Sequence, residues 1–228
     1  MGELTGTDGI LLLGIDTCGP AGSVALARLV GDDLQILGET ALEGRTYSAT
    51  LIASVDELLK TNGVALSFIG CIVVVSGPGS FTGVRIGLSA AKGLAEGANL
   101  NAVAVSRLEV LARKAGLPDA ALDAHRHEVF LLAKGRELLA GTADLAAVDS
   151  APAQIAVCDD AASTLLAGAW PGTEIHRVGA PTAADAVALA IPRIQAGDFA
   201  DVLLLDGHYL RRSDAEIFGD PANAGARR

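Results

Sequence analysis

The sequence contains few aromatic residues, few basic residues and few cysteines, and the last two shortages each exclude a class of protein. Phe, Trp and Tyr together make up 4% of the 228 residues. The 17 lysines and arginines are outnumbered by 27 acidic residues, and the net charge of −10 makes the isolated chain a poor binder of nucleic acids and anionic membranes. The three cysteines show no C-x-x-C spacing, which argues against a disulfide framework and fits a reducing compartment.

Long apolar runs and targeting signals are missing as well. Between Thr61 and Val84 the chain carries no charged residue, yet the unbroken apolar part of this stretch is only Cys71–Val75. A membrane-spanning helix needs about 20 apolar residues. Glu3 and Asp8 stand where a secretory signal needs positive charge. The sequence therefore predicts a cytoplasmic protein that does not associate with membranes.

Half of the residues are hydrophobic, and their spacing predicts alternating strands and helices. In the first half we expect strands at Ile10–Ile15, Ser23–Leu29, Gln35–Thr40, Cys71–Val75 and Ala102–Val105, with helices at Tyr47–Lys60 and Thr82–Gly97. In the second half we expect strands at Ala120–Leu122, His127–Lys134, Glu137–Ala140, Ile155–Cys158 and Glu174–Val178, with helices at Leu108–Ala115, Ala161–Ala167 and Ala183–Gln195. This order indicates an α/β protein.

The two halves of the chain repeat one pattern. Each half has an apolar strand that ends in an aspartate, Asp16 or Asp123, followed by a turn and a second strand. The repeat predicts duplicated βββαβα units with a cleft between two lobes, which is the actin-like (ASKHA) architecture. We place an amino-terminal lobe at residues 1–106, a smaller carboxy-terminal lobe at 107–218 and a flexible tail at 219–228.

Two turns are candidates for phosphate binding. The segment Gly77–Gly83 opens a helix, but it lacks the Gly-Lys-Ser/Thr ending of a Walker A loop and the spacing of a dinucleotide fingerprint. Acting alone, this segment is better interpreted as a tight turn that lets the helix pack on the sheet. The turn after Asp16 lies where actin-like ATPases hold a metal-bound nucleotide, but the matching turn Asp123–Arg126 has no glycine. A vestigial phosphate or nucleotide site would consist of Asp16, Thr17, Gly77, Gly79 and Ser80.

Other catalytic patterns find no support in the sequence. No G-x-S-x-G nucleophile elbow is present. His125 and His127 are close in the chain, but two ligands without a third do not make a zinc site. We therefore predict no catalytic residue and no metal site.

Small residues recur every four positions along the second helix, at Gly83, Gly87, Ala91 and Ala95. Glycine inside a helix costs up to about 1 kcal/mol, so Gly87 needs a packing reason. One interpretation is close packing on the protein's own sheet. The other is a docking face for a partner helix, beside which Arg85, Ser89 and Lys92 supply hydrogen bonds. The pattern alone favours neither.

The segment 74–95 contains the string Gly-Pro-Gly-Ser-Phe-Thr-Gly-x-Arg-x-Gly, beginning at Gly77, and strongly resembles the signature of the bacterial TsaB (YeaZ) family. The segments Leu13–Thr17, Ser48–Leu59, Glu128–Phe130 and Tyr209–Glu216 also fit, so the resemblance extends over nearly the whole chain. Four positions depart from residues that are frequent in the family: Cys18, Tyr47, His125 and His208.

The resemblance implies an actin-like fold and a role in forming N6-threonylcarbamoyladenosine at position 37 of tRNAs that read ANN codons. In that pathway the paralogue TsaD transfers the threonylcarbamoyl group, TsaB is its non-catalytic scaffold and activator, and the ATPase TsaE joins them. TsaB pairs with TsaD through the first two helices of each amino-terminal lobe, and it self-associates as a homodimer through the same surface. By this resemblance tRNA is bound only through the complex, and the one cofactor left open is a nucleotide at the partner interface.

The resemblance also carries expectations for individual residues. TsaD holds its metal with an H-x-x-x-H pair on the helix that corresponds to Tyr47–Lys60, where this chain has no histidine, so a transfer site is missing. The expected partner-binding residues are Tyr47, Ser48, Leu51, Val55, Leu58, Gly83, Arg85, Gly87, Ser89, Ala91 and Lys92. The alternative function is a stand-alone, small actin-like ATPase or phosphotransferase that uses Asp16 and the segment Gly77–Gly83. A peptidase would need a nucleophile–base pair that the sequence does not offer.

Overall fold

The first apolar run of the chain forms the central strand of a five-stranded mixed sheet in the computed structural model, which describes residues 9–43, 46–147 and 151–211. The strands are β1 (Ile10–Asp16), β2 (Ala21–Val30), β3 (Asp33–Glu43), β4 (Ile69–Val75) and β5 (Asn101–Val105), in the order β3-β2-β1-β4-β5. The first three form an antiparallel meander, whereas β4 and β5 run parallel to β1.

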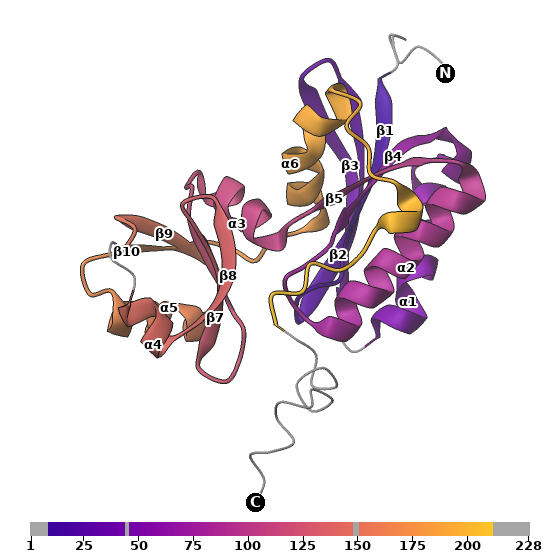
Figure 1. The fold of residues 1–228 in the computed structure, drawn as a ribbon. Helices are drawn as coiled ribbons and strands as arrows, with labels where there is room; N and C mark the ends of the chain where they lie inside the picture. The colour runs from indigo at the N-terminus through magenta and orange to yellow at the C-terminus, as the bar shows by residue number, and fades with distance from the viewer. Residues whose placement is uncertain (1–8, 44–45, 148–150, 212–228) are drawn as a thin grey trace, which may run out of the picture.

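A second sheet repeats this topology. Its strands are β6 (Ala120–Asp123), β7 (Glu128–Ala133), β8 (Arg136–Gly141), β9 (Gln154–Val157) and β10 (Glu174–Arg177), in the order β10-β9-β6-β7-β8. The meander β6-β7-β8 is again antiparallel, and β9 and β10 are again parallel to the central strand. The predicted duplicated units and two-lobe actin-like fold are therefore confirmed (Figure 1).

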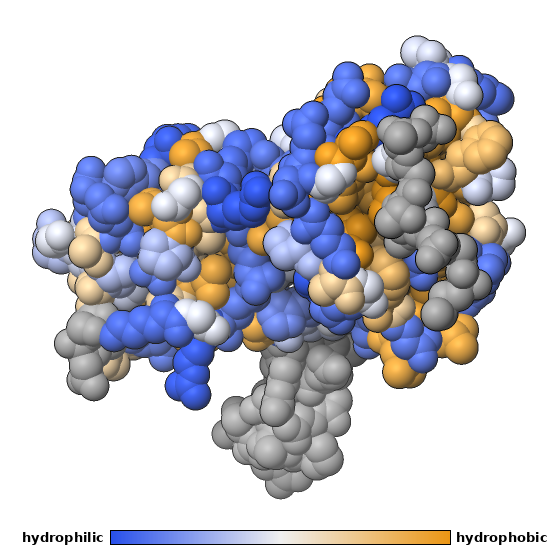
Figure 2. All heavy atoms as spheres, turned by 90° about the horizontal axis from the view of Figure 1, so that it is seen from above, coloured by the Kyte–Doolittle hydropathy of each residue, from blue (hydrophilic) through white to orange (hydrophobic). Residues whose placement is uncertain are grey.

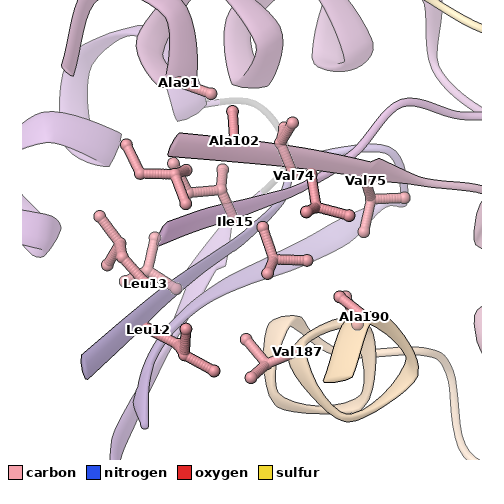
Figure 3. Close-up of a cluster of buried hydrophobic side chains, with 14 of the residues drawn as sticks. Leu12, Leu13, Ile15, Val74, Val75, Ala91, Ala102, Val187 and Ala190 are labelled. Carbon is pink, nitrogen blue, oxygen red and sulfur yellow. The ribbon is translucent and has the colours of Figure 1, made fainter. Parts of the chain in front are cut away.

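Helices cover both faces of each sheet. In the first lobe, α1 (Tyr47–Thr61) and α2 (Phe81–Ala98) lie on one face, and α6 (Ala183–Gln195) lies on the other. Figure 3 shows Ala91 of α2 above the first sheet and Val187 and Ala190 of α6 below it. In the second lobe, α4 (Thr142–Ala146) and α5 (Asp160–Ala169) pack on one face and α3 (Arg107–Ala115) on the other. Two short 3-10 turns, Leu66–Phe68 and Val202–Leu204, complete the described elements.

In each repeat the last helix packs on the sheet of the other lobe. Helix α3, which follows β5, packs on the second sheet, and α6, which follows β10, packs on the first. We expected Ala183–Gln195 to belong with the second lobe, but α6 packs in the core of the first sheet. The Ser23 hydroxyl accepts a hydrogen bond from the Ala183 amide at 2.8 Å, and Glu39 accepts one from the Ala184 amide at 3.1 Å. These acceptors satisfy the free N–H groups at the start of the helix, so the first lobe holds α6 by its end as well as by its apolar face. The division at residue 106 itself stays a prediction.

Some expectations differ from the structure or lie beyond it. The helix α4 was not predicted, because five residues are too short for helical periodicity to be visible. The predicted tail at 219–228 and the family-like residues after Arg211 lie outside the described part of the chain. Within that part, none of the helices combines the length and apolar character needed to cross a bilayer.

The glycines of α2 explain how closely this helix approaches the sheet. The Thr17 hydroxyl donates a 2.7 Å hydrogen bond to the Gly83 carbonyl. A Cβ atom on Gly83 would collide with the Thr17 carbonyl, and one on Gly87 would collide with the Thr17 hydroxyl. The small residues at Gly83, Gly87 and Ala91 are therefore buried against the chain's own sheet and turn, as the first of the two interpretations requires.

Replacing Gly87 by alanine should destabilise the protein by about 1–3 kcal/mol, because the added methyl group displaces a buried hydroxyl from its hydrogen bond. The matched control is Gly93→Ala on the same helix, where a Cβ atom meets nothing within 4 Å. That change should stabilise the protein by about 0.5–1 kcal/mol through helix propensity. Urea unfolding of both variants measures the difference, and equal effects at the two positions would contradict the packing.

Candidate functional site

Hydrogen bonds within the turn and to neighbouring elements close the turn after β1. Asp16 is fully buried, and its Oδ1 accepts a hydrogen bond from the Cys18 amide at 2.8 Å. The Cys18 thiol lies 3.3 Å from the Val75 carbonyl, to which it donates. The Tyr47 hydroxyl donates to the Gly19 carbonyl at 2.9 Å. Burial, followed by the negative charge of Asp16, raises the pKa of the Cys18 thiol and raises that of Tyr47 to about 12, so both side chains stay protonated at neutral pH.

A buried arginine at the start of α3 provides the counter-ion for this turn. Arg107, the first residue of α3, places its Nε atom 3.7 Å from Asp16 Oδ2, and the side chains are 7% and 0% exposed. Burial, the largest single influence, acts to lower the pKa of Arg107, but Asp16 together with smaller contributions from neighbouring groups outweighs it, and the pKa is raised. Neither Asp16 Oδ2 nor Arg107 Nε has a hydrogen-bond partner among the described residues. The interaction between these two atoms is therefore electrostatic attraction without a hydrogen bond.

The five residues of the predicted vestigial phosphate site do come together, but protein fills the space between them. The Ser80 amide donates to the Cys18 carbonyl at 2.8 Å, and a Cβ atom on Gly79 would collide with that carbonyl. The guanidinium of Arg107 lies so close to Gly19 that a side chain there would collide with it. Gly77 accepts a 2.7 Å hydrogen bond from the Arg107 amide. A phosphate could approach this turn only if the arginine moved away.

The corresponding turn of the second lobe has a different geometry. His125, Arg126 and His127 all have left-handed backbones, with φ values of 61°, 58° and 61°. A left-handed conformation costs a non-glycine residue about 1–2 kcal/mol, so three in succession indicate a turn that its surroundings hold in place. His125 Nδ1 lies 2.9 Å from Asp123 Oδ2, and the Arg211 guanidinium donates to the Ala124 carbonyl at 2.9 Å. These contacts give a structural role to His125, one of the four family departures.

A third cluster joins the two lobes near the start of α3. Glu137 of β8 accepts a hydrogen bond from the Ser106 hydroxyl, and its other oxygen lies 2.7 Å from His208 Nε2. The His208 amide also donates to the Ser76 carbonyl at 2.8 Å. Across the described residues, no group of three or more His, Cys, Asp or Glu side chains is arranged to hold a metal ion. This cluster therefore acts as a polar link between lobes.

The residues expected to bind a partner divide into buried and exposed sets. Five side chains of the expected list, Tyr47, Leu51, Val55, Leu58 and Ala91, are at most 6% exposed, and Gly83 and Gly87 are buried with them. These seven pack against the chain's own core, and the partner-binding role expected of them stays a prediction. The apolar stripe of an amphipathic helix faces its own core first. Ser48, Arg85 and Ser89 are exposed, and Lys92 is half-buried.

Sequence reasoning missed the apolar residues on the outer face of the same two helices. Ile52 of α1 is 53% exposed, and Ile86 and Ala90 of α2 are half-buried. Gly93 has open space where a side chain would be. Figure 2 shows hydrophobic residues at the surface of the first lobe, among hydrophilic ones. The available signal was Ile52 itself, a large apolar residue outside the core-facing stripe of its helix. We call Ile52, Ile86, Ala90 and Gly93 the outer face.

Removing Arg107 should be costly, because Asp16 would remain buried without its counter-ion. We expect Arg107→Met to lower the free energy of unfolding by about 3–5 kcal/mol. The double variant Asp16→Asn/Arg107→Met should be less destabilised than the sum of the two single variants, since it removes both charges. Urea denaturation measures all three. Arg113→Met, an exposed position on the same helix, is the control and should change stability by less than about 0.5 kcal/mol. Additive effects at Asp16 and Arg107 would contradict the ion pair.

Comparison with known proteins places the chain among proteins of tRNA modification. The family model described as tRNA N6-adenosine threonylcarbamoyltransferase (TsaD) matches residues 39–170, more than half of the chain. Two curated relatives carry the name tRNA threonylcarbamoyladenosine biosynthesis protein TsaB. The protein of Haemophilus influenzae is 36% identical over 56% of this chain and 55% of its own length, and that of Escherichia coli K12 is 39% identical over 52% of each.

A solved structure agrees over a longer range. YeaZ from Pseudomonas aeruginosa matches 88% of this chain and 100% of its own, with a TM-score of 0.66 and 28% identity. The chain spans about half the length of the curated relatives it matches. The family model, the curated relatives and this structure agree with the signature that begins at Gly77. The chain belongs to the TsaB (YeaZ) family.

Proposed function

We propose that this protein is a non-catalytic scaffold and activator subunit in the formation of N6-threonylcarbamoyladenosine at position 37 of ANN-decoding tRNAs. Family membership carries the proposal, since the curated relatives are named for this biosynthesis. The partner is a TsaD-type transferase, joined by the ATPase TsaE, and tRNA binds to the complex. The protein also forms a homodimer when the transferase is absent.

The closed Asp16 turn supports a non-catalytic role. A nucleotide clamp needs an accessible carboxylate and free backbone N–H groups around the phosphates. Asp16 is instead fully buried and paired with Arg107, and the Cys18 amide is bonded to Asp16 itself. These contacts disfavour the alternative of a stand-alone ATPase or phosphotransferase.

The outer face supports docking through α1 and α2. Ile52 exposes half of its surface to water, and Gly93 leaves room for another helix to approach closely. Burial of apolar surface between two helix pairs is the usual driving force for a four-helix contact. Ser48 and Ser89 are exposed on the same helices and are available for hydrogen bonds at the rim.

The docking proposal is tested by Ile52→Asp. A charge at the centre of an apolar contact should weaken the complex with the TsaD-type partner by at least about tenfold. The matched control is Val30→Asp at the end of β2, which changes an apolar residue of similar exposure, 46% against 53%. Analytical ultracentrifugation of mixed proteins gives the dissociation constants. Equal affinities for the two variants would remove this surface from the proposal.

The alternative ATPase is tested by calorimetry of the isolated chain with Mg-ATP. We expect no heat of binding at micromolar concentrations, because reaching Asp16 requires the displacement of Arg107. Micromolar binding that is abolished by Asp16→Ala would favour the ATPase over the scaffold.

A further inference from the structure

A groove beside α2 lies next to the proposed docking face and shares Ser89 with its rim. The chain between Phe199 and Arg211, which we call the strap, runs along the first lobe next to α2 (Figure 1). The groove between strap and helix has a volume of about 1030 Å³. Five of its lining residues carry aromatic rings or positive charges: Phe81, Arg85, Lys92, Tyr209 and Arg211. We call these five residues the cation–aromatic groove.

The two rings and one arginine of this groove are in mutual contact. The ring centroids of Phe81 and Tyr209 are 4.9 Å apart with their planes tilted by 48°, and the Arg85 guanidinium carbon lies 3.7 Å from the centroid of Phe81 and 6.0 Å from that of Tyr209. Arg85 Nε donates to the Tyr209 hydroxyl at 3.4 Å, which fixes the arginine against both rings. Phe81 and Tyr209 remain 37% and 38% exposed. This exposed surface is open to contact by a ligand.

Positive charge continues from these three residues in both directions. On one side, the Lys92 ammonium donates to the Leu203 carbonyl at 3.2 Å, which leaves two of its three N–H groups for a ligand. On the other side, Arg211 contacts the Ala124 carbonyl and Glu128, which brings the exposed turn His125–His127 to the end of the groove. Two acidic residues lie nearby, Asp206 in the groove and Glu128 paired with Arg211.

This concentration of cations stands out on a chain with a net charge of −10. At physiological ionic strength the Debye length is about 8 Å, so the acidic residues on distant surfaces are largely screened from a ligand in the groove. The local cations then dominate short contacts, whereas long-range attraction is absent. Such a site adds contacts to a ligand that another protein already holds, and it binds weakly by itself.

We propose that the cation–aromatic groove binds single-stranded RNA, with a base against the exposed surface of Phe81 and Tyr209 and phosphates beside Lys92 and Arg211. Unpaired bases are recognised by stacking on aromatic rings and arginine planes, and backbone cations supply the rest. The inference rests on the proposed function, in which the RNA is the tRNA held by the transferase complex. An acidic peptide is the competing occupant, but it would not need two exposed aromatic rings beside the cations.

The test measures binding of an unmodified ANN-decoding tRNA transcript to the reconstituted transferase complex by fluorescence anisotropy. Tyr209→Ala should weaken tRNA binding by about tenfold, because loss of a stacking ring removes one base contact. Tyr209→Phe is the matched control, since it keeps the ring and loses only the Arg85 hydrogen bond, and it should stay within about twofold of the original affinity. Lys92→Gln should lower the slope of log affinity against log salt by about 0.7.

Further controls separate the groove from the docking proposal. Arg28→Gln removes one exposed charge from β2, outside the groove, and should leave the salt slope unchanged. Ultracentrifugation must show that each groove variant still forms the protein complex. Unchanged tRNA affinity in an intact complex would overturn the inference. So would loss of the protein complex in Tyr209→Ala or Lys92→Gln, because that result assigns the groove to a protein segment.

A second measurement does not depend on the partner. Ultraviolet cross-linking of the isolated chain to the same tRNA at low salt should yield RNA-linked peptides that contain Phe81 or Tyr209, and a fully paired RNA duplex should yield none. This experiment remains informative if the chain fails to bind a transferase, which would refute the proposed function alone. Cross-links confined to other peptides would overturn the RNA site.

Discussion

The close packing of the Asp16–Gly19 turn onto the glycine-rich start of α2 is the constraint on which the rest of the structure depends. The Thr17 carbonyl occupies the space where Gly83 lacks a side chain, and the Thr17 hydroxyl occupies the corresponding space at Gly87. The hydrogen bond from this hydroxyl to the Gly83 carbonyl fixes the helix at one height above the sheet. This contact places the inner face of α2 on the core and thereby turns Gly93 and Ala90 outward. It also sets Phe81, at the first turn of the helix, beside the strap. One small-residue contact therefore positions two different surfaces.

The buried ion pair ties that contact to the junction of the two lobes. Burying opposite charges costs several kcal/mol of desolvation, and their attraction repays this only in good geometry. Here Asp16 and Arg107 are 3.7 Å apart, and the Arg107 amide holds the Gly77 carbonyl. Ser106, the neighbouring residue, reaches Glu137 of the second lobe. The arginine thus provides the counter-ion of the buried Asp16, and it keeps the closed turn aligned with the second lobe.

Much of the fold could be predicted from hydrophobic periodicity, and the parts that could not share a physical reason. The strands and helices are local patterns, so the order of both repeats was visible in the chain. Periodicity gives the apolar face of α6, but not which of two sheets that face will cover. The small residues of α2 fit two interpretations, because a smooth helix face packs equally well on a sheet or on a partner. Arg107 was missed, since an arginine at the start of a helix usually remains in solvent.

The proposed binding surfaces are even harder to predict from the sequence than the fold, because they join residues that lie far apart in the chain. Arg85 and Tyr209 are 124 positions apart, and no local pattern indicates that the strap brings them together. The charge of −10 argues against independent binding of nucleic acid, but it averages over surfaces that a ligand in the groove does not sense. On an acidic protein, a small group of cations gains affinity only when a partner supplies the remaining contacts. In the proposed complex the groove depends on docking: docking through the outer face would bring RNA to the groove, and the groove would have little effect without it.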